Sequence, residues 1–276
     1  MPQLLNGSYV KTNRPLVSII TPTLNSERFI GDNIKSVLSQ TYPNIEHIIV
    51  DGGSTDNTLS IVREMDPKAV IISEPDEGIS DAFNKGLGLA KGDIIAILNS
   101  DDYYEHNRVV ERVAKVLESD RGIKLLYGKV RGIDPVTGMT VVVYGESFSM
   151  GKMKKRLIIP HPAVFACREV YEKVGQFSLE YKISIDYDYL LRAAHLYNPV
   201  FLDEELTVLR LGGASTKHIY LAHRETYRIM RANGVWLLFA VMNLLHRYCV
   251  TTASLLLQKS GLSGILFSYR RLKGRL

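Results

Sequence analysis

The sequence predicts an α/β fold, in which helices flank a mainly parallel sheet and a helical segment follows at the C-terminal end. Between residues 15 and 105, short apolar runs alternate with segments whose apolar residues recur at helical spacing. This alternation is typical of βαβ units. After residue 217 the strand-like runs stop and helix-like stretches follow. We therefore expect a flexible arm over 1–14, one domain over 15–216 and a helical segment over 217–276.

The first half of the domain is expected to hold four strands and three helices in alternation. Its strand-like runs are short and rich in isoleucine and valine, which suits strands that are buried on both faces. Its helix-like segments carry apolar residues three and four positions apart, and the Ser, Thr and Asp at 54–56 can cap the second of them. The expected strands are Val17–Ile20, Ile45–Val50, Ala69–Ser73 and Ile94–Leu98. The expected helices are Phe29–Gln40, Asn57–Glu64 and Ser80–Ala90.

The second half of the domain, over 106–216, is less regular. The segment 134–138 has the sequence Asp-Pro-Val-Thr-Gly, a strong hairpin-turn signal. It separates two predicted strands, Lys124–Val130 and Met139–Tyr144. Helices are expected over Val109–Leu117 and Tyr187–Tyr197, and Asn198-Pro199 stops the second one.

Composition excludes several classes of protein. The 276 residues are 46% hydrophobic and 23% charged, which is ordinary for a folded globular chain and not for a disordered one. Cys167 and Cys249 are the only cysteines, which argues against a disulfide framework and favours a reducing compartment such as the cytosol. Residues 1–16 hold no apolar stretch of the length that a secretion signal needs. The net charge of +5 permits contact with nucleic acid, anionic lipid or phosphorylated ligands.

The C-terminal segment combines apolar runs with basic residues. His218–Asn233 is polar and basic, whereas Val235–Leu245 and Val250–Leu257 are apolar. Neither run reaches the roughly 20 residues that cross a bilayer, so no transmembrane helix is expected. Beside the basic stretch Arg270–Arg275, such helices suit peripheral association with a membrane surface. The alternative is that they pack against the main domain or a second subunit, as in a homo-oligomer.

Acidic residues follow three of the predicted strands. Asp51, Asp76 and Asp101 each lie within three residues of a strand end, and the carboxyl ends of parallel strands share one edge of a sheet. The run Asn99-Ser100-Asp101-Asp102 places two adjacent carboxylates there, which repel each other unless something compensates their charge. Mg²⁺ and Mn²⁺ take such oxygen ligands and share them with substrate phosphates. The alternative is ordinary turn and helix-cap chemistry.

Blocks of residues in a specific order carry a resemblance to one family. Those of the first half are Val17–Asn25, Ile49–Asp56, Asp76–Gly86 and Leu98–Asp102. Those of the second half are His161–Phe165, Gly175–Phe177, Ile185–Asp188 and Leu211–Thr216. Together they resemble the family-2 inverting glycosyltransferases, which have the Rossmann-like GT-A fold. The resemblance covers about Pro15 to Gly213 and implies a nucleotide-sugar-binding half over 15–105 and an acceptor half over 106–216.

The resemblance implies a donor site. Asp51 would accept a hydrogen bond from the base, and a carboxylate suits the N–H edge of uracil or thymine, which implies a UDP- or dTDP-sugar. The alternative for Asp51 is a turn acid before Gly52-Gly53, and His161 could be a packed loop histidine. The residues that the resemblance assigns to nucleotide-sugar binding are Pro22, Thr23, Asn25, Glu27, Asp51, Asp76, Lys85, Asn99, Ser100 and His161.

The resemblance also implies a divalent cation, Mg²⁺ or Mn²⁺, that acts as a Lewis acid on the diphosphate. The metal motif of the family is usually Asp-any-Asp, and this chain has Asn99 at the first position of that motif. Asp101 would bind the metal. Asp102 would either bind the metal directly or hydrogen-bond to one of its ligands. Asn99 would help the ribose or a metal-bound water.

Asp186 is the predicted catalytic residue. It matches the family's general base, although Ile185 precedes it where the family commonly has Glu. Inversion needs attack by an acceptor hydroxyl, and one carboxylate can take its proton. Asp186 is also a good helix N-cap, and the two roles are compatible. Asp188 is two residues further on and would point elsewhere on the helix.

Other functions are less consistent with the sequence. A sugar nucleotidyltransferase would carry a glycine-rich loop with arginine and lysine after the first strand, and a nicotinamide oxidoreductase would carry Gly-x-Gly-x-x-Gly; Thr21–Asn25 has neither. A non-catalytic nucleotide-sugar or glycan-binding module stays open because of Asn99. Gly212–Thr216 could offer N–H groups to phosphate, and no arginine or tryptophan signature of the processive synthases follows it. Transfer of a single sugar to a glycan or lipid-linked acceptor is therefore expected, with no nucleic acid as partner.

Overall fold

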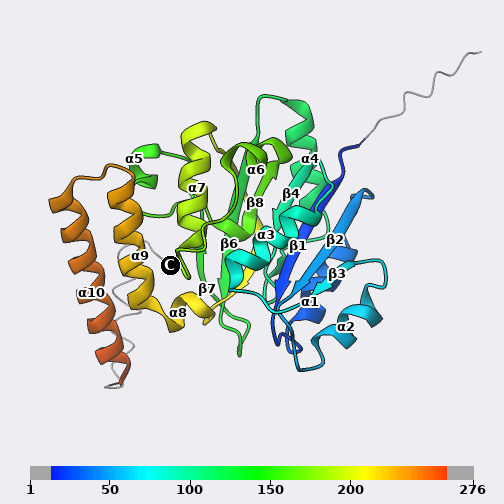
Figure 1. Ribbon diagram of the computed structural model, residues 1–276, viewed down its shortest axis with the longest axis horizontal. Helices are drawn as coiled ribbons and strands as arrows, with labels where there is room; N and C mark the ends of the chain where they lie inside the picture. Colours follow the sequence, from blue (N-terminus) through cyan, green and yellow to red (C-terminus); the bar gives the residue numbers. More distant parts are fainter. Residues whose placement is uncertain (1–13, 260–276) are drawn as a thin grey trace, which may run out of the picture.

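The computed structural model describes residues 14–259, which form a twisted sheet with helices on both faces (Figure 1). The strands of this part of the chain are β1 Val17–Thr23, β2 Ile45–Asp51, β3 Val70–Ser73, β4 Ile94–Ile97, β5 Tyr103–Tyr104, β6 Leu125–Ile133, β7 Thr140–Tyr144, β8 Val164–Cys167 and β9 Val200–Arg210. The helices are α1 Ile30–Leu38, α2 Thr58–Met65, α3 Ile79–Leu89, α4 Val109–Ser119, α5 Met150–Met153, α6 Arg168–Val174, α7 Ile185–Leu196, α8 Ala214–Lys217, α9 Ile219–Ala232 and α10 Leu237–Lys259. A 3₁₀ turn, η1, covers His161–Ala163.

One half of the sheet is parallel. Its strand order is β3-β2-β1-β4, and Val17 of β1 lies level with Ile45 on one side and Ile94 on the other. Every residue of β1 is buried, because helices cover both faces. The predicted strands and helices of residues 15–105 are all present, with ends that differ from the expectation by up to three residues. This arrangement brings the carboxyl ends of the four strands to one edge.

The packing of α3 onto the sheet depends on a glycine. A Cβ at Gly86 would overlap Cγ2 of Ile20 in β1 and lie 3.2 Å from Cγ2 of Val50 in β2. Glycine therefore lets the backbone of α3 approach the sheet more closely than any other residue would.

Gly86→Ala is expected to lower the free energy of unfolding by about 1–3 kcal/mol, because the added methyl overpacks this contact. The gain in helix propensity, about 1 kcal/mol, is smaller. Chemical denaturation measures the free energy of unfolding of the wild type and of each variant. Gly88→Ala is the matched control on the exposed side of the same helix, where a Cβ meets nothing within 4 Å, and it should stabilise the protein. Equal effects of the two substitutions would contradict the packing argument.

The other half of the sheet is mixed. β8 pairs antiparallel with β4 and β6, whereas β9 runs parallel to β6. The predicted hairpin is confirmed, since β6 and β7 pair antiparallel and the Asp134 N–H donates to the Met139 carbonyl at 2.9 Å. β8 and β9 were not predicted. β9 carries three acids in its middle, Asp203, Glu204 and Glu205, which hide its strand pattern and which pair with Lys129, Arg112 and Arg131.

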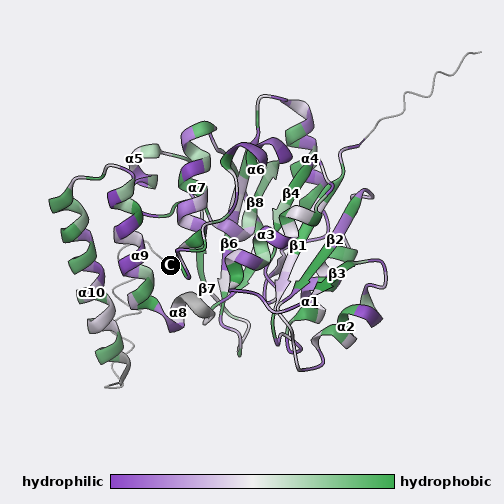
Figure 2. Ribbon diagram, viewed as in Figure 1, coloured by the Kyte–Doolittle hydropathy of each residue, from purple (hydrophilic) through white to green (hydrophobic). Residues whose placement is uncertain are grey.

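The C-terminal part of the described chain is a pair of helices beside α7. The two apolar runs expected as separate helices are one continuous helix, α10, because no glycine or proline divides them. α9 lies between α10 and α7 (Figure 1), and α10 is hydrophobic along most of its length (Figure 2). Within residues 14–259, no helix is both long and apolar enough to span a bilayer. The arm 1–13 and the basic stretch Arg270–Arg275 lie outside the described residues.

Candidate active site

The loops that follow β1, β2 and β4 are joined by hydrogen bonds at the carboxyl ends of the parallel strands. The Asn25 side chain accepts the Thr55 N–H at 2.9 Å, and the Asn25 N–H donates to the Ser54 hydroxyl at 2.8 Å. The hydroxyls of Ser26 and Ser100 lie 2.8 Å apart. Glu27 accepts the Asn57 N–H at 3.0 Å. Asn25 and Glu27 therefore hold the edge loops together, while Pro22 and Thr23 lie buried at the end of β1.

Asp51, the last residue of β2, is 1% exposed. One of its carboxylate oxygens accepts the Ser54 hydroxyl at 2.5 Å. The other accepts the Gly53 and Ser54 N–H groups at 3.2 and 3.0 Å and the Ser73 hydroxyl at 2.7 Å. A carboxylate has roughly four lone-pair sites. Three of these bonds fall on one oxygen, so the oxygen that accepts only the Ser54 hydroxyl keeps a lone pair for a base N–H.

Asp76 and Lys85 order the loop between β3 and α3. A Cβ at residue 52 would overlap Oδ2 of Asp76, so any larger residue there would displace this carboxylate from the β2 loop. The Lys85 ammonium donates to the Pro75 carbonyl at 2.9 Å and pairs with Glu74 at 3.0 Å and Asp81 at 3.1 Å. The charge of Lys85 is thus already matched by two carboxylates.

Asn99, Ser100, Asp101 and Asp102 follow β4 and form an acidic cluster. Asp102 is 1% exposed and accepts the Arg210 N–H at 3.3 Å. Burial raises the pKa of Asp101, and burial together with the neighbouring Asp101 charge raises the pKa of Asp102 well above its usual range. Two adjacent carboxylates repel each other, and a cation bound to them would compensate their charge.

Arg210, at the end of β9, supports this cluster and was not predicted from the sequence. Its guanidinium lies 4.7 Å from the Phe29 ring and 4.8 Å from the Tyr103 ring, and it donates to the Asp101 carbonyl at 2.7 Å. It also pairs with Asp32 of α1. The sequence signal was slight: a single arginine before Gly212-Gly213, about a hundred residues from the acids it contacts.

The acidic cluster fits a hard divalent cation. The side-chain oxygen of Asn99 is buried and has no hydrogen-bond partner, which is costly unless a ligand completes it. Together with the carboxylates of Asp101 and Asp102 it offers three oxygen donors, the type that Mg²⁺ and Mn²⁺ prefer. Within residues 14–259, no three His, Cys, Asp or Glu side chains are grouped as a metal site. Asn99 in the place of an acid accounts for this at the cluster, and phosphate and water would have to complete the coordination.

Asp186 lies in the first turn of α7. The N-cap residue is Ser184 and the helix begins at Ile185, so Asp186 is its second residue and the expectation that Asp186 caps this helix is wrong. Its carboxylate accepts the N–H of its neighbour Tyr187 at 2.8 Å, and no ion pair involves it among the described residues. Burial raises the pKa of Asp186 to about 6, and the Glu225 charge adds to this effect. Asp188, by contrast, pairs with Arg192 at 3.0 Å.

Tyr144, at the end of β7, relates the acidic cluster to Asp186. Tyr144 is 38% exposed; partial burial raises its pKa, and the charges of Asp102 and Asp186 raise it further. Both carboxylates therefore act on one phenol, although 84 residues separate them in the chain (186 − 102). Tyr144 was not among the predicted site residues.

His161 lies in η1 and is buried. Its ring stacks on Phe83 of α3, with centroids 5.3 Å apart, and meets Phe177 edge-on at 5.9 Å. Burial lowers the pKa of His161 to about 4, so the ring is neutral at pH 7. It cannot offer a positive charge to a diphosphate, and its surroundings are those of a packed histidine.

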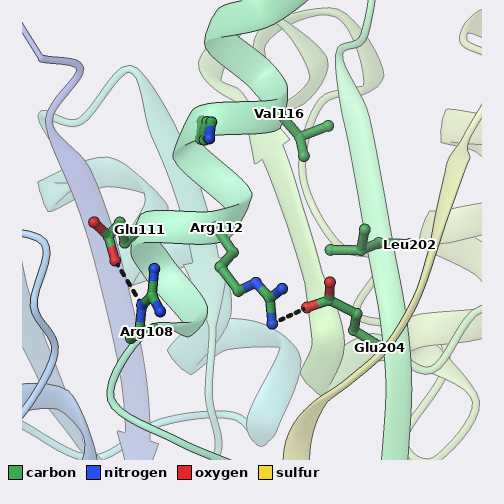
Figure 3. Close-up of a pocket in the computed structure, with 7 residues that line it drawn as sticks. Arg108, Glu111, Arg112, Val116, Leu202 and Glu204 are labelled. Carbon is green, nitrogen blue, oxygen red and sulfur yellow. Dashed lines mark hydrogen bonds and ion pairs between the residues drawn. The ribbon is translucent and has the colours of Figure 1, made fainter.

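Two hollows lie outside the acidic cluster. One of about 330 Å³ lies between α4 and β9, where Arg108 pairs with Glu111 and Arg112 with Glu204 (Figure 3). It contains none of the predicted site residues. The other, of about 440 Å³, borders Arg210 and Tyr103 beside α1 and so adjoins the acidic cluster.

Comparison with known proteins identifies the family. The model of glycosyl transferase family 2 matches residues 18–165, more than half of the chain. The chain belongs to this family. An uncharacterised glycosyltransferase of Mycobacterium tuberculosis is 34% identical to it over 192 residues, which are 68% of this chain and 72% of the relative.

Solved structures of glycosyltransferases share the fold. A fragment of TarS from S. aureus in complex with UDP-GlcNAc has a TM-score of 0.65 and 22% identity, and the match covers 79% of this chain. It covers 65% of the TarS fragment, which is less than two thirds of its length. The mannosyltransferase PcManGT from Pyrobaculum calidifontis, in complex with GDP-Man and Mn²⁺, has a TM-score of 0.62 and 20% identity over 95% of this chain and 83% of that one. The predicted GT-A fold, with C-terminal helices after it, is confirmed.

Proposed function

We propose that this family-2 glycosyltransferase moves a single sugar from a UDP- or dTDP-sugar to a hydroxyl of a glycan or lipid-linked acceptor, with inversion at the anomeric carbon. The observation that supports the proposal is that Asp102 of the acidic cluster and Asp186, which has no cationic partner among the described residues, both raise the pKa of Tyr144. Residues 15–105 would bind the donor and residues 106–216 the acceptor.

The base of the reaction is Asp186. No cation pairs with it among the described residues, and its pKa of about 6 leaves it ionised at neutral pH but basic enough to accept a proton. It would take the proton of the acceptor hydroxyl as that oxygen attacks the anomeric carbon. Attack from the side opposite the leaving diphosphate inverts the configuration.

The donor would lie against the loops after β1, β2 and β4. Asn99, Asp101 and Asp102 would hold Mg²⁺ or Mn²⁺, which when bound neutralises charge on the departing nucleoside diphosphate. The Mn²⁺ and GDP-Man bound by PcManGT and the UDP-GlcNAc bound by TarS are consistent with a metal and a nucleotide sugar here.

A panel of nucleotide sugars tests the proposal. The purified protein is expected to gain thermal stability with a UDP- or dTDP-sugar in the presence of Mn²⁺, and to release the nucleoside diphosphate when an acceptor is added. Stabilisation without any transfer would favour the second candidate, a binding module without activity, which Asn99 keeps open. Absence of stabilisation by every donor would contradict both.

The pH dependence of transfer follows from Asp186. We expect kcat/KM to fall as the pH drops through about 6, because the active form is the ionised carboxylate and a raised pKa keeps it protonated over a wider acidic range. Initial rates between about pH 5 and pH 8 would show this limb. A profile that stays flat to pH 5 would argue against Asp186 as the base.

We further propose that the enzyme binds peripherally to the inner face of the cell membrane through α10. Exposed apolar side chains recur along one face of this helix, at Leu238, Met242, Leu245 and Leu256. After Glu225 the chain holds eight Lys and Arg residues and no Asp or Glu. An apolar face with a wholly basic surrounding sequence complements an anionic lipid surface.

Vesicle sedimentation checks the membrane proposal. Wild-type protein is expected to pellet with vesicles rich in phosphatidylglycerol, less so at high salt, and not with phosphatidylcholine alone. Met242→Glu with Leu245→Glu should abolish binding. The control pair, Val136→Glu with Met139→Glu, changes apolar residues of the β6–β7 hairpin turn that are even more exposed, and it should bind as wild type. A stable dimer that ignores all vesicles would support the homo-oligomer instead.

A further inference from the structure

Glu225 of α9 holds the turn that leads into Asp186. We propose that Glu225 is a positioning residue for the catalytic base, so that the C-terminal helices form part of the active-site framework. This inference rests on the proposed function, because it assigns Asp186 the role of base.

The contacts of Glu225 are all with the backbone just before α7. The side chain is 3% exposed, and one of its oxygens accepts the Lys182 N–H at 2.8 Å. The other accepts the N–H groups of Ile183 at 2.9 Å and Ser184 at 2.8 Å. The Ser184 hydroxyl in turn donates to the Ala222 carbonyl of α9 at 3.2 Å. Three successive N–H donors and one hydroxyl thus fix this turn to α9 directly before α7 begins.

The chemistry of these contacts requires a carboxylate. No ion pair involves Glu225 among the described residues, so the side chain is buried without a neutralising cation. A buried charge is retained only where strong hydrogen bonds replace its water, and bonds from N–H groups to a carboxylate are of this kind. Glutamine has the same shape but one acceptor oxygen, and its NH₂ group would face backbone N–H groups.

The charge of Glu225 also acts on Asp186. Around Asp186, the titratable or charged groups are Glu225 from α9, Tyr144 from β7, and Asp188 and Arg192 from its own helix, which pair with each other. Arg247 of α10 lies near the neighbouring Tyr187. Glu225 is therefore the negative charge that disfavours ionisation of Asp186, in the direction that makes a carboxylate a better base.

The position of Glu225 in the chain makes this inference informative. It lies outside residues 18–165, which match the family, and it is the last acidic residue of the sequence. Without this contact, the only role proposed for the C-terminal segment would be to bind the enzyme to a membrane. Through Glu225 it reaches the start of the helix that carries the base.

The test compares three single variants with the wild type in the donor-panel assay. Glu225→Gln is expected to lower kcat by about 10²-fold, since small displacements of a catalytic group have effects of this size. The KM for the donor and the thermal stabilisation by the donor should stay unchanged, because the loops proposed to bind the donor follow β1, β2 and β4, whereas Glu225 holds the turn before α7. The acid limb of the pH profile should move to lower pH, which a purely structural defect would not produce. Glu225→Asp keeps the charge but not the reach, so it should lower kcat without moving that limb.

Glu180→Gln is the matched control. Glu180 is an exposed acid of the same connection, 72% exposed at its side chain, and it meets Arg228 of α9 at 3.5 Å. Its loss should change kcat by no more than about twofold, as for most surface ion pairs. Full kcat in Glu225→Gln would overturn the inference, as would a normal kcat in Glu225→Asp if the glutamine variant does not fold. If the wild type transfers no sugar, or if Asp186→Asn is fully active, it is the proposed function that fails.

Discussion

Asp186→Asn is expected to lower kcat by about 10² to 10⁴-fold, the usual contribution of a general base. Asparagine keeps the size of the side chain and can still accept the Tyr187 N–H, so the fold and the donor site should survive. The KM for the donor and the thermal shift by the donor are therefore expected to stay as in the wild type. Steady-state kinetics with varied donor and acceptor would separate the two effects.

Asp188→Asn is the control for this substitution. Asp188 lies in the same helical turn but pairs with Arg192, so its replacement should cost some stability and little activity. Unchanged transfer by Asp186→Asn would remove this residue from the mechanism. Loss of donor binding in the same variant would instead show that Asp186 serves the donor site.

Asp101→Asn is expected to have the second large effect, a loss of about 10²-fold or more in kcat. Asp101 is the partly exposed acid of the cluster, and with Asn99 already neutral its replacement would leave Asp102 as the one carboxylate there. The extra thermal stability that Mn²⁺ confers in the presence of the donor should disappear as well. Treatment of the wild type with a chelator should reproduce both losses, and added Mn²⁺ should reverse them.

An exposed acid of β9 serves as the control for Asp101. Asp203→Asn removes a carboxylate that is 73% exposed and pairs with Lys129, far from the cluster in the chain, and it should leave the metal response intact. Transfer by Asp101→Asn at the wild-type rate, with or without chelator, would show that the acidic cluster binds no catalytic metal.

The parallel half of the fold could be predicted because its strands are short, rich in isoleucine and valine, and followed by turn residues. Val17–Thr23 and Ile94–Ile97 are buried along their whole length, which favours this apolar composition. β9 could not be predicted in this way, since Asp203, Glu204 and Glu205 are stabilised by cations from other elements. Strand identity there depends on tertiary partners that no local pattern reveals.

The site could be predicted only in part. Acids at strand ends were visible in the sequence, and the structure places Asp51, Asp76 and Asp101 after parallel strands of one sheet. The sequence could not show that two hydroxyls donate to Asp51, or that burial keeps His161 neutral. Arg210, Tyr144 and Glu225 escaped prediction because each acts on residues far away in the chain. Such supporting groups have no fixed spacing from the residues they serve.

The hydrogen bonds between α9 and the turn before α7 limit where the chain of this enzyme can be shortened. Cutting the chain near residue 217 would seem a natural way to isolate a minimal family domain, yet it would strip the hydrogen-bond acceptors from Lys182, Ile183 and Ser184. It would also uncover the side of the domain against which Ile229 and Met230 are buried. A shortened enzyme that loses activity would say nothing about membranes or acceptors, because the turn before α7 would already have lost the contacts that hold it to α9.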